Sequence, residues 1–165
     1  MTLAPPTVVV ADERSDDDSP QVEVDTDRWG RLALEVLVDE ETTGELTLTF
    51  IDRGDIAELN VEHMGAQGPT DVLSFPMDDE SLDGVPTLLG DVVISPAVAA
   101  DQFADHAGTI DDELALLVVH GILHVLGHDH AAPDEAAVMR ACEIDLLERF
   151  HWSGPAPSGF RQTHE

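Results

Sequence analysis

The chain has 165 residues, a length that suits one domain with a substantial hydrophobic core. Hydrophobic residues make up 42% of it and charged residues 25%, which favours a globular protein over a disordered one. Thirty-five acidic residues against seven basic ones, all of them Arg, give a formal net charge of −28, and such a surface repels nucleic acid. Composition alone therefore favours a small-molecule, peptide or cationic partner, or an acidity that serves only solubility.

The cysteine content and the hydropathy pattern bear on location. The single cysteine, Cys142, excludes an internal disulfide framework and a zinc site built from several cysteines. A lone thiol fits a reducing compartment, so we expect a cytoplasmic protein. No run approaches the ~18 consecutive apolar residues of a membrane-spanning helix, and the N-terminus lacks the basic-then-apolar pattern of a signal peptide. We therefore expect no membrane partner, and the oligomeric state stays open.

The first third of the chain predicts a strand, an acidic loop, a helix and a second strand. The β-branched run Val8–Val10 predicts the first strand, and the acidic stretch Asp12–Pro20 predicts a solvated loop. Helical spacing of apolar residues over 29–37 predicts the helix, and the alternating stretch Glu45–Ile51 predicts the second strand. The cap of this helix is one of three residues, Asp25, Thr26 or Asp27, and its inward positions are Trp29, Leu32, Ala33, Val36 and Leu37.

The middle of the chain predicts a short helix, two strands and a further helix. Residues 53–63 predict the short helix, and Val72–Phe75 and Leu88–Ile94 predict the strands. Ser95–Pro96 then opens a helix that runs to about His106, with serine as the cap and proline at the first position. The inward positions expected of the short helix are Ile56, Leu59 and Val61.

Two more helices and a tail complete the prediction. One helix begins at Thr109 or Asp111 and reaches Leu126, and its acidic first turn suits the helix dipole. The last helix begins at Pro133, and its expected inward positions are Ala137, Val138, Ala141, Ile144, Leu146 and Leu147. The pattern predicts one α/β (α+β) domain over residues 1–152, with a mixed sheet of about four strands and surrounding helices. Residues 153–165, rich in Gly, Pro and Ser at first, predict a flexible tail.

Three histidines occur at and just after the end of the helix predicted to reach residue 126. His120 and His124 are four residues apart, so their side chains share one face of a helix. Gly127 accepts the left-handed conformation that ends a helix, and the chain can then bring His130 back to the pair. The spacing H-x-x-x-H-x-x-G-x-x-H is that of metzincin zinc sites. We therefore predict that the three histidines bind one divalent metal ion, with Zn²⁺ as the first choice.

The predicted centre differs from a metalloprotease site at one position. Gly121 stands where the protease sequence H-E-x-x-H carries its general-base glutamate. Three histidine ligands leave a fourth position open to water, which distinguishes catalytic from structural zinc. His128 is the nearest rival ligand, and three imidazoles also suit nickel, copper or iron. The pattern thus predicts a catalytic metal-dependent site without the protease base.

Three sequence blocks, in order along the chain, resemble one known family. HGILHVLGHDH at residues 120–130 resembles the H-G-x-L-H-x-x-G-Y/H-D-H signature of the YbeY family of bacterial endoribonucleases. Leu59-Asn60 followed by PTDVLSFP at residues 69–76 resembles that family's L-N-x(8)-P-T-D/N-V-L-S-F-P. LGDVVIS at residues 89–95 resembles its L-G-D-I-x-I-S strand. The resemblance covers about residues 45–148.

The resemblance implies a metal-dependent enzyme that hydrolyses RNA. It implies an α/β fold with a small mixed sheet, one zinc ion with a bound water, and cleavage of single-stranded ribosomal RNA. It also implies maturation of the 3′ end of small-subunit ribosomal RNA and ribosome quality control, with that RNA and the small subunit as partners. A chain this acidic can meet the subunit through basic ribosomal proteins.

The chain departs from the family pattern where a phosphate-binding arginine is expected. Members often carry this Arg after the Leu-Asn pair, in L-N-x-x-Y-R, and here the position holds Met64. A thioether cannot hold a phosphate in the bidentate manner of arginine. Arg53 and Arg140 are candidate substitutes, and Ser74 is a candidate to present its hydroxyl near the metal. Beyond the expected metal-bound water, the sequence names no catalytic group.

Two other functions stay open at this point. A different metal-dependent hydrolase, acting on peptides or small esters, is favoured by the metzincin spacing and disfavoured by Gly121. A non-catalytic metal-binding factor of ribosome assembly is favoured by Met64 and by the acidity of the chain.

Overall fold

Strands and helices follow one another in the order that the sequence predicts. The computed structural model describes residues 5–15, 20–65, 70–77, 88–106, 109–128, 132–158, 160 and 162. Its elements are β1 (Thr7–Asp12), α1 (Thr26–Asp39), β2 (Glu45–Phe50), α2 (Arg53–Leu59), a π-helical turn η1 (Asn60–Met64), β3 (Val72–Pro76), β4 (Leu88–Ile94), α3 (Pro96–His106), α4 (Ile110–Val125) and α5 (Pro133–Phe150). None of the helices in these ranges has the length and apolarity needed to span a membrane.

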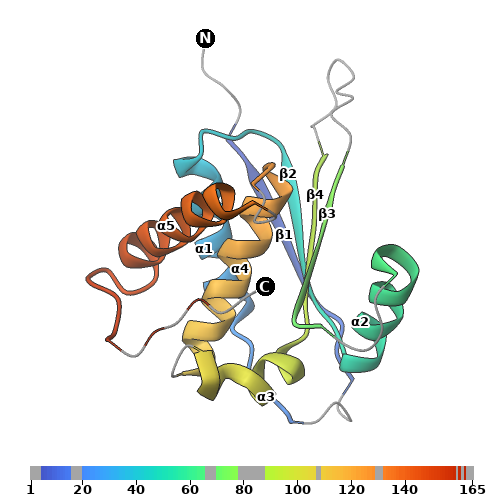
Figure 1. Cartoon of the computed structure of the whole chain (residues 1–165). Coiled ribbons are helices and arrows are strands. Elements are labelled where there is room, and N and C mark those ends of the chain that lie inside the picture. Colours follow the sequence, from blue (N-terminus) through green and yellow to red (C-terminus); the bar gives the residue numbers. More distant parts are fainter. Residues whose placement is uncertain are drawn as a thin grey trace.

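The four strands form one mixed sheet in the order β1-β2-β4-β3. β1, β2 and β4 run parallel, whereas β3 lies antiparallel to β4 at the edge. Parallel neighbours cannot be joined by tight hairpins, and helices accordingly occur in the connections between them. The predicted α+β domain with a four-stranded mixed sheet is confirmed. In Figure 1, α1, α4 and α5 cover one face of the sheet, and α2 lies on the other side.

The main core lies between the sheet and the three helices on that face. Alternate residues of β2 (Leu46, Leu48 and Phe50) are fully buried there, and all five inward positions predicted for α1 are buried. α4 is buried on every side from Asp112 to Leu123, because it contacts the sheet, α1, α3 and α5. A smaller core lies under α2 on the opposite face, and its buried residues are Ile51, Ile56, Leu73 and Val93.

Some inward positions predicted for two helices are wrong. Val61 is 55% exposed, because the π-helical turn begins at Asn60 and changes the register, so that Asn60 is buried instead. On α5, Ala137, Val138 and Ala141 are exposed. The buried residues of α5 are Ala136, Met139, Glu143, Leu146 and Leu147. The buried face therefore contains the carboxylate of Glu143, which the spacing of apolar residues does not reveal.

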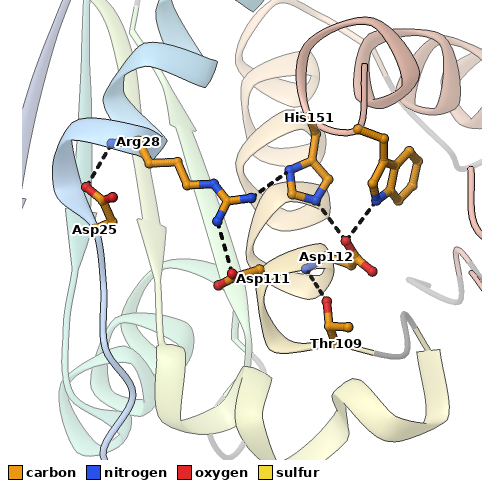
Figure 2. Close-up of polar contacts among 7 residues, drawn as sticks. Asp25, Arg28, Thr109, Asp111, Asp112 and His151 are labelled. Carbon is orange, nitrogen blue, oxygen red and sulfur yellow. Dashed lines mark hydrogen bonds and ion pairs between the residues drawn. The ribbon is translucent and has the colours of Figure 1, made fainter. Parts of the chain in front are cut away.

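Polar side chains cap α1, α3 and α4. The carboxylate of Asp25 accepts a hydrogen bond from the backbone N–H of Arg28 at 3.1 Å, which settles the cap of α1 (Figure 2). Ser95 caps α3 by accepting from Val98 N at 3.3 Å. Thr109 caps α4 by accepting from the N–H of Asp112 at 3.0 Å. These caps fix where each helix starts.

A polar network fastens the start of α4 (Figure 2). The carboxylate of Asp112 accepts hydrogen bonds from His151 Nε2 at 2.8 Å and from Trp152 Nε1 at 2.9 Å. Arg28 on α1 binds Asp111 at 3.0 Å and lies 3.4 Å from the other ring nitrogen of His151. The network joins α1, the start of α4 and the turn after α5. It thereby fixes the position of α4 along its axis, and so the position of the histidines in its last turns.

The structure describes the predicted acidic loop and the predicted C-terminal tail only in part. Residues 16–19 of the acidic loop lie outside the described residues. The flexibility of residues 153–165 stays a prediction, although several of these residues make defined contacts, among them Gly154 and Ala156 with Glu148. Phe160 packs edge-on against Trp152 with ring centroids 4.8 Å apart, and Gln162 hydrogen-bonds to α5.

Candidate metal centre

His120 and His124 lie side by side near the C-terminal end of α4. Their ring centroids are 4.6 Å apart and their planes are inclined by 80°. His120 is 8% exposed and His124 is half-buried. This is the neighbour relation that two residues four apart have on a helix. His130 lies outside the described residues, so the three-histidine centre stays a prediction.

Each of the two rings is held at Nδ1 by an oxygen acceptor. His120 Nδ1 lies 2.5 Å from Glu143 Oε2, and His124 Nδ1 lies 3.0 Å from the carbonyl oxygen of His128. Carbonyl and ionised carboxylate oxygens only accept, so Nδ1 is the donor in both rings. In the neutral imidazole the lone pair is then on Nε2. In the neutral form, both rings would therefore have the tautomer of metal-binding histidines, whose second nitrogen commonly donates to a carboxylate or carbonyl.

Gly127 ends α4 and turns the chain back over it, as predicted. It has a φ of 103°, which favours glycine. Its N–H donates to His124 O at 3.1 Å, and the N–H of His128 donates to Leu123 O at 2.9 Å. This pair of bonds is a standard left-handed ending of a helix. The same turn directs the carbonyl of His128 toward His124, so the end of the helix also orients a candidate ligand.

Glu143 is a site residue that the sequence reasoning missed. It is 3% exposed on the buried face of α5, where an unpartnered carboxylate would be strongly disfavoured. His120 binds one of its oxygens, and Gln162 Nε2 donates to the other at 2.8 Å. A sequence signal existed, because Glu143 lies four residues after Met139 and three before Leu146 on a buried stripe. An acid on such a stripe indicates a buried partner.

Gly121 and Ser74 lie where α4 packs directly on the sheet. A Cβ at Gly121 would come within 2.5 Å of Val92 Cγ1 and 3.3 Å of Val72 Cγ2. Ser74 on β3 donates its hydroxyl hydrogen to the carbonyl of Gly121 at 2.9 Å. Glycine at 121 thus lets the helix approach the sheet, and Ser74 fastens it there. A substrate-binding role for Ser74 stays a prediction.

The two candidate substitutes for the missing arginine have different surroundings. Arg53 pairs with Asp101 at 2.7 Å and also reaches the carbonyl of Ala97 at 3.4 Å, so α3 holds its guanidinium. Arg140 is exposed on α5, one turn before Glu143, and forms no ion pair with any residue in the described ranges. The side chain of Met64 is not among those that the structure describes.

Comparison with known proteins places the chain in a family. A family model described as Endoribonuclease YbeY matches residues 13–151. The chain belongs to this family. Proteins named Endoribonuclease YbeY from Mycolicibacterium gilvum and Salinispora tropica are 43% and 44% identical to it, over 120 and 138 residues. The first alignment covers 68% of this chain and 67% of the relative, and the second covers 76% and 87%.

A solved structure supports the fold of this Endoribonuclease YbeY family member. The solution structure of TM1509 from Thermotoga maritima superposes with a TM-score of 0.56 at 20% identity, covering 96% of this chain and 99% of that one. At this identity the likeness concerns the fold alone. The family resemblance seen in the three sequence blocks is confirmed, and membership makes the chain a nuclease and therefore a hydrolase.

One group of three side chains in the described part of this YbeY-family chain has ligand atoms spaced for a metal ion. It consists of Glu40, His128 and Cys142, whose ligand atoms all lie within 4.8 Å of one another. Glu40 Oε1 is 3.7 Å from His128 Nε2 and 3.9 Å from Cys142 Sγ. His128, the rival ligand, thus turns its ring toward Glu40 while its carbonyl faces His124. The group is separate from the three predicted ligands.

The thiol of Cys142 is expected to react slowly. Burial raises its pKa from 9.0 to about 11, and nearby carboxylates add to the effect, in the order Glu40, Asp145, Asp39 and Glu143. A pKa two units higher leaves about a hundredfold less thiolate at any pH below both values. We expect iodoacetamide to alkylate metal-free protein at pH 8 about a hundredfold more slowly than a peptide thiol, and the rate to rise with pH up to about 11. Mass spectrometry of timed samples measures this rate, and a profile that levels off near pH 9 would contradict the expectation.

Proposed function

We propose that the chain is a zinc-dependent endoribonuclease that cleaves single-stranded ribosomal RNA in the cytoplasm. Its chief role would be maturation of the 3′ end of small-subunit ribosomal RNA, with a part in ribosome quality control. The observation that carries the proposal is the pair of imidazoles His120 and His124, each with Nδ1 held by an acceptor, in a chain of an endoribonuclease family. His130 would complete the ligand set.

The residues present suit a zinc ion. His120 and His124 would bind it through Nε2, the nitrogen that carries the lone pair in both rings. When bound, zinc supplies a Lewis acid that polarises a phosphoryl oxygen and lowers the pKa of a coordinated water. Glu143 fixes the orientation of the His120 ring, and the carbonyl of His128 orients His124. The chain's own contribution is thus to hold the two imidazoles in one orientation, each with Nδ1 against an oxygen acceptor.

A peptidase function has little support in the packing around Gly121. The general base of the protease pattern would be a side chain at this position. A Cβ there already meets Val92 at 2.5 Å, so a glutamate would have to push α4 away from the sheet. Position 121 therefore carries no general base and has no space for a glutamate side chain.

Arg140 is our candidate for the phosphate contact. It is exposed on the same helix as Glu143, whereas Arg53 is engaged by Asp101. With a net charge of −28, the chain as a whole repels RNA, so a local cation and basic ribosomal proteins would have to offset that repulsion. The small ribosomal subunit is the partner that this proposal requires.

The direct test is cleavage of a defined RNA. Purified protein is incubated with a single-stranded RNA that carries the 3′ end of small-subunit ribosomal RNA, and in parallel with the same RNA annealed to its complement. We expect cleavage of the single strand only, its loss after chelation and its return on addition of Zn²⁺. Cleavage that survives complete metal removal would exclude zinc dependence. Absence of cleavage by zinc-loaded protein would favour the non-catalytic assembly factor.

Removal of the anionic acceptor that contacts His120 is expected to weaken the metal centre in part. Glu143→Gln keeps the size of the side chain but replaces the anionic acceptor that orients His120. We expect zinc affinity or kcat/KM to fall by about 10–100-fold, as when partners of metal-binding histidines are removed. Zinc affinity is measured by competition with a chromophoric chelator, and cleavage by initial rates. Glu58 is an exposed glutamate on α2, so Glu58→Gln serves as the control and should change neither quantity. Unchanged zinc affinity together with unchanged kcat/KM in Glu143→Gln would argue against the role.

A further inference from the structure

Glu40, His128 and Cys142 come from three separate elements and meet at one place. Glu40 is the residue after α1, His128 follows the glycine turn that ends α4, and Cys142 lies in α5. The side chains of His128 and Glu40 are 28% and 25% exposed, and Cys142 is half-buried. The group is thus partly shielded by the fold and still reachable from solvent.

Two of the three distances within the group are close to those of a tetrahedral zinc site, and the ligand atoms all lie within 4.8 Å of one another. With zinc bonded to nitrogen and oxygen near 2.0 Å and to sulfur near 2.3 Å, N and O ligands lie about 3.3 Å apart, and O and S ligands about 3.5 Å apart. The corresponding distances are 3.7 Å from His128 Nε2 to Glu40 Oε1, and 3.9 Å from Cys142 Sγ to Glu40 Oε1. For these two pairs, a contraction of a few tenths of an ångström, within reach of side-chain rotation, would reach the distances of a zinc site.

The surroundings favour a cation of the zinc type. Thiolate and imidazole are ligands of borderline-soft divalent metals, whereas calcium and magnesium take oxygen ligands. The carboxylates of Asp39, Glu143 and Asp145 act on Cys142 in addition to that of Glu40, so a cation would relieve their mutual repulsion. A surface pocket of about 420 Å³, lined by His128 together with Asp134 and Glu135, gives an ion an approach from solvent.

We propose that Glu40, His128 and Cys142 form a second metal site, which binds a zinc-type divalent ion apart from the three-histidine centre. Binding replaces the thiol proton of Cys142, which passes to the solvent, by a metal–sulfur bond. The proposal stands on the geometry of the described residues and does not depend on the proposed function.

The second site would brace the predicted catalytic centre. The carbonyl of His128 holds His124, and Glu143, the neighbour of Cys142 in the chain, holds His120. An ion between Glu40, His128 and Cys142 would therefore tie the end of α1 to His128 and to the part of α5 that carries Glu143. Its expected effect is higher thermal stability and higher affinity of the histidine centre for its own metal.

Cobalt provides a test, because Cys142 is the only thiol in the chain. The metal-free full chain is titrated with Co²⁺, thiolate-to-cobalt charge-transfer absorption is recorded in the near ultraviolet, and bound ions are counted by native mass spectrometry. We expect the charge-transfer band and two ions per chain. Cys142→Ser should lose the band and one ion, whereas His124→Ala should keep the band. Asp145→Asn, which removes a nearby charge but no ligand, should also keep it.

Further variants keep the proposal testable if Cys142→Ser does not fold. Glu40→Gln and His128→Gln retain the thiol, and each should weaken the Co²⁺ affinity read from the band at least about tenfold. Circular dichroism confirms that each variant is folded. Absence of the band in wild type at Co²⁺ concentrations that fill the histidine centre would overturn the proposal. Loss of the band in His124→Ala would overturn it as well, because the thiol would then belong to a single shared site.

Discussion

Replacing His124 with alanine is expected to reduce RNA cleavage by about a thousandfold or more. The substitution removes one of three predicted ligands, and Lewis-acid stabilisation of a phosphoryl transition state contributes several kcal/mol, where each 1.36 kcal/mol is about tenfold in rate. The fold should survive, because His124 is half-buried and the hydrogen bond between its ring and His128 O is worth about 1 kcal/mol. The expected variant is therefore folded and poor in metal.

The measurements for His124→Ala are kcat/KM on single-stranded RNA, zinc content and the thermal unfolding midpoint. His63→Ala is the matched control, because His63 is an exposed histidine on η1 whose ring packs on Phe75 rather than on α4. It should retain metal and activity. Cleavage by His124→Ala within tenfold of wild type would show that the histidine pair is not the catalytic metal centre. Loss of activity with full zinc content would instead assign His124 a role on the substrate.

Gly90→Ala is expected to give the largest loss of stability, about 3–5 kcal/mol. Gly90 has a φ of +152°, and a Cβ there would lie 2.5 Å from the backbone oxygen of Phe75 and 3.1 Å from Pro76 Cα. Strained backbone conformations cost about 1–3 kcal/mol and overpacking costs a similar amount. The neighbours are backbone atoms of β3, the edge strand that pairs with β4, so relief requires that this pairing open. Native proteins are stable by only about 5–15 kcal/mol, so the variant would be close to unfolding.

Urea unfolding of the metal-free chain, followed by tryptophan fluorescence, measures the effect of Gly90→Ala. Gly54→Ala is the control, because Gly54 lies in α2 and a Cβ there meets nothing within 4 Å. Alanine is the better helix former by about 1 kcal/mol, so this control should be neutral or slightly stabilising. A loss below about 1 kcal/mol for Gly90→Ala would show that the edge of the sheet yields more easily than its geometry indicates.

Local signals account for the elements that the sequence predicts correctly. The glycine that ends α4 and the alternating run of β2 each depend on residues within one or two turns of the position concerned, and the cap of α1 is one of the three residues that local sequence offered. The pair His120 and His124 belongs to the same class, because helix geometry alone places residues four apart on one face. The buried face of α5, in contrast, does not follow from local signals. Val138, predicted to point inward, is 62% exposed.

By itself, then, the sequence determined the order of the elements, the histidine pair, the turn that follows it and the family. Only the tertiary structure decided what surrounds the pair. The rotation of α5 about its axis brings Glu143 to His120, 23 residues away, and the packing of α1 brings Glu40 to Cys142, 102 residues away. Such contacts depend on how whole helices pack on one another. Neighbouring residues in the chain do not show which distant side chain such a contact reaches, whereas caps, turns and helical spacing are read within a few residues.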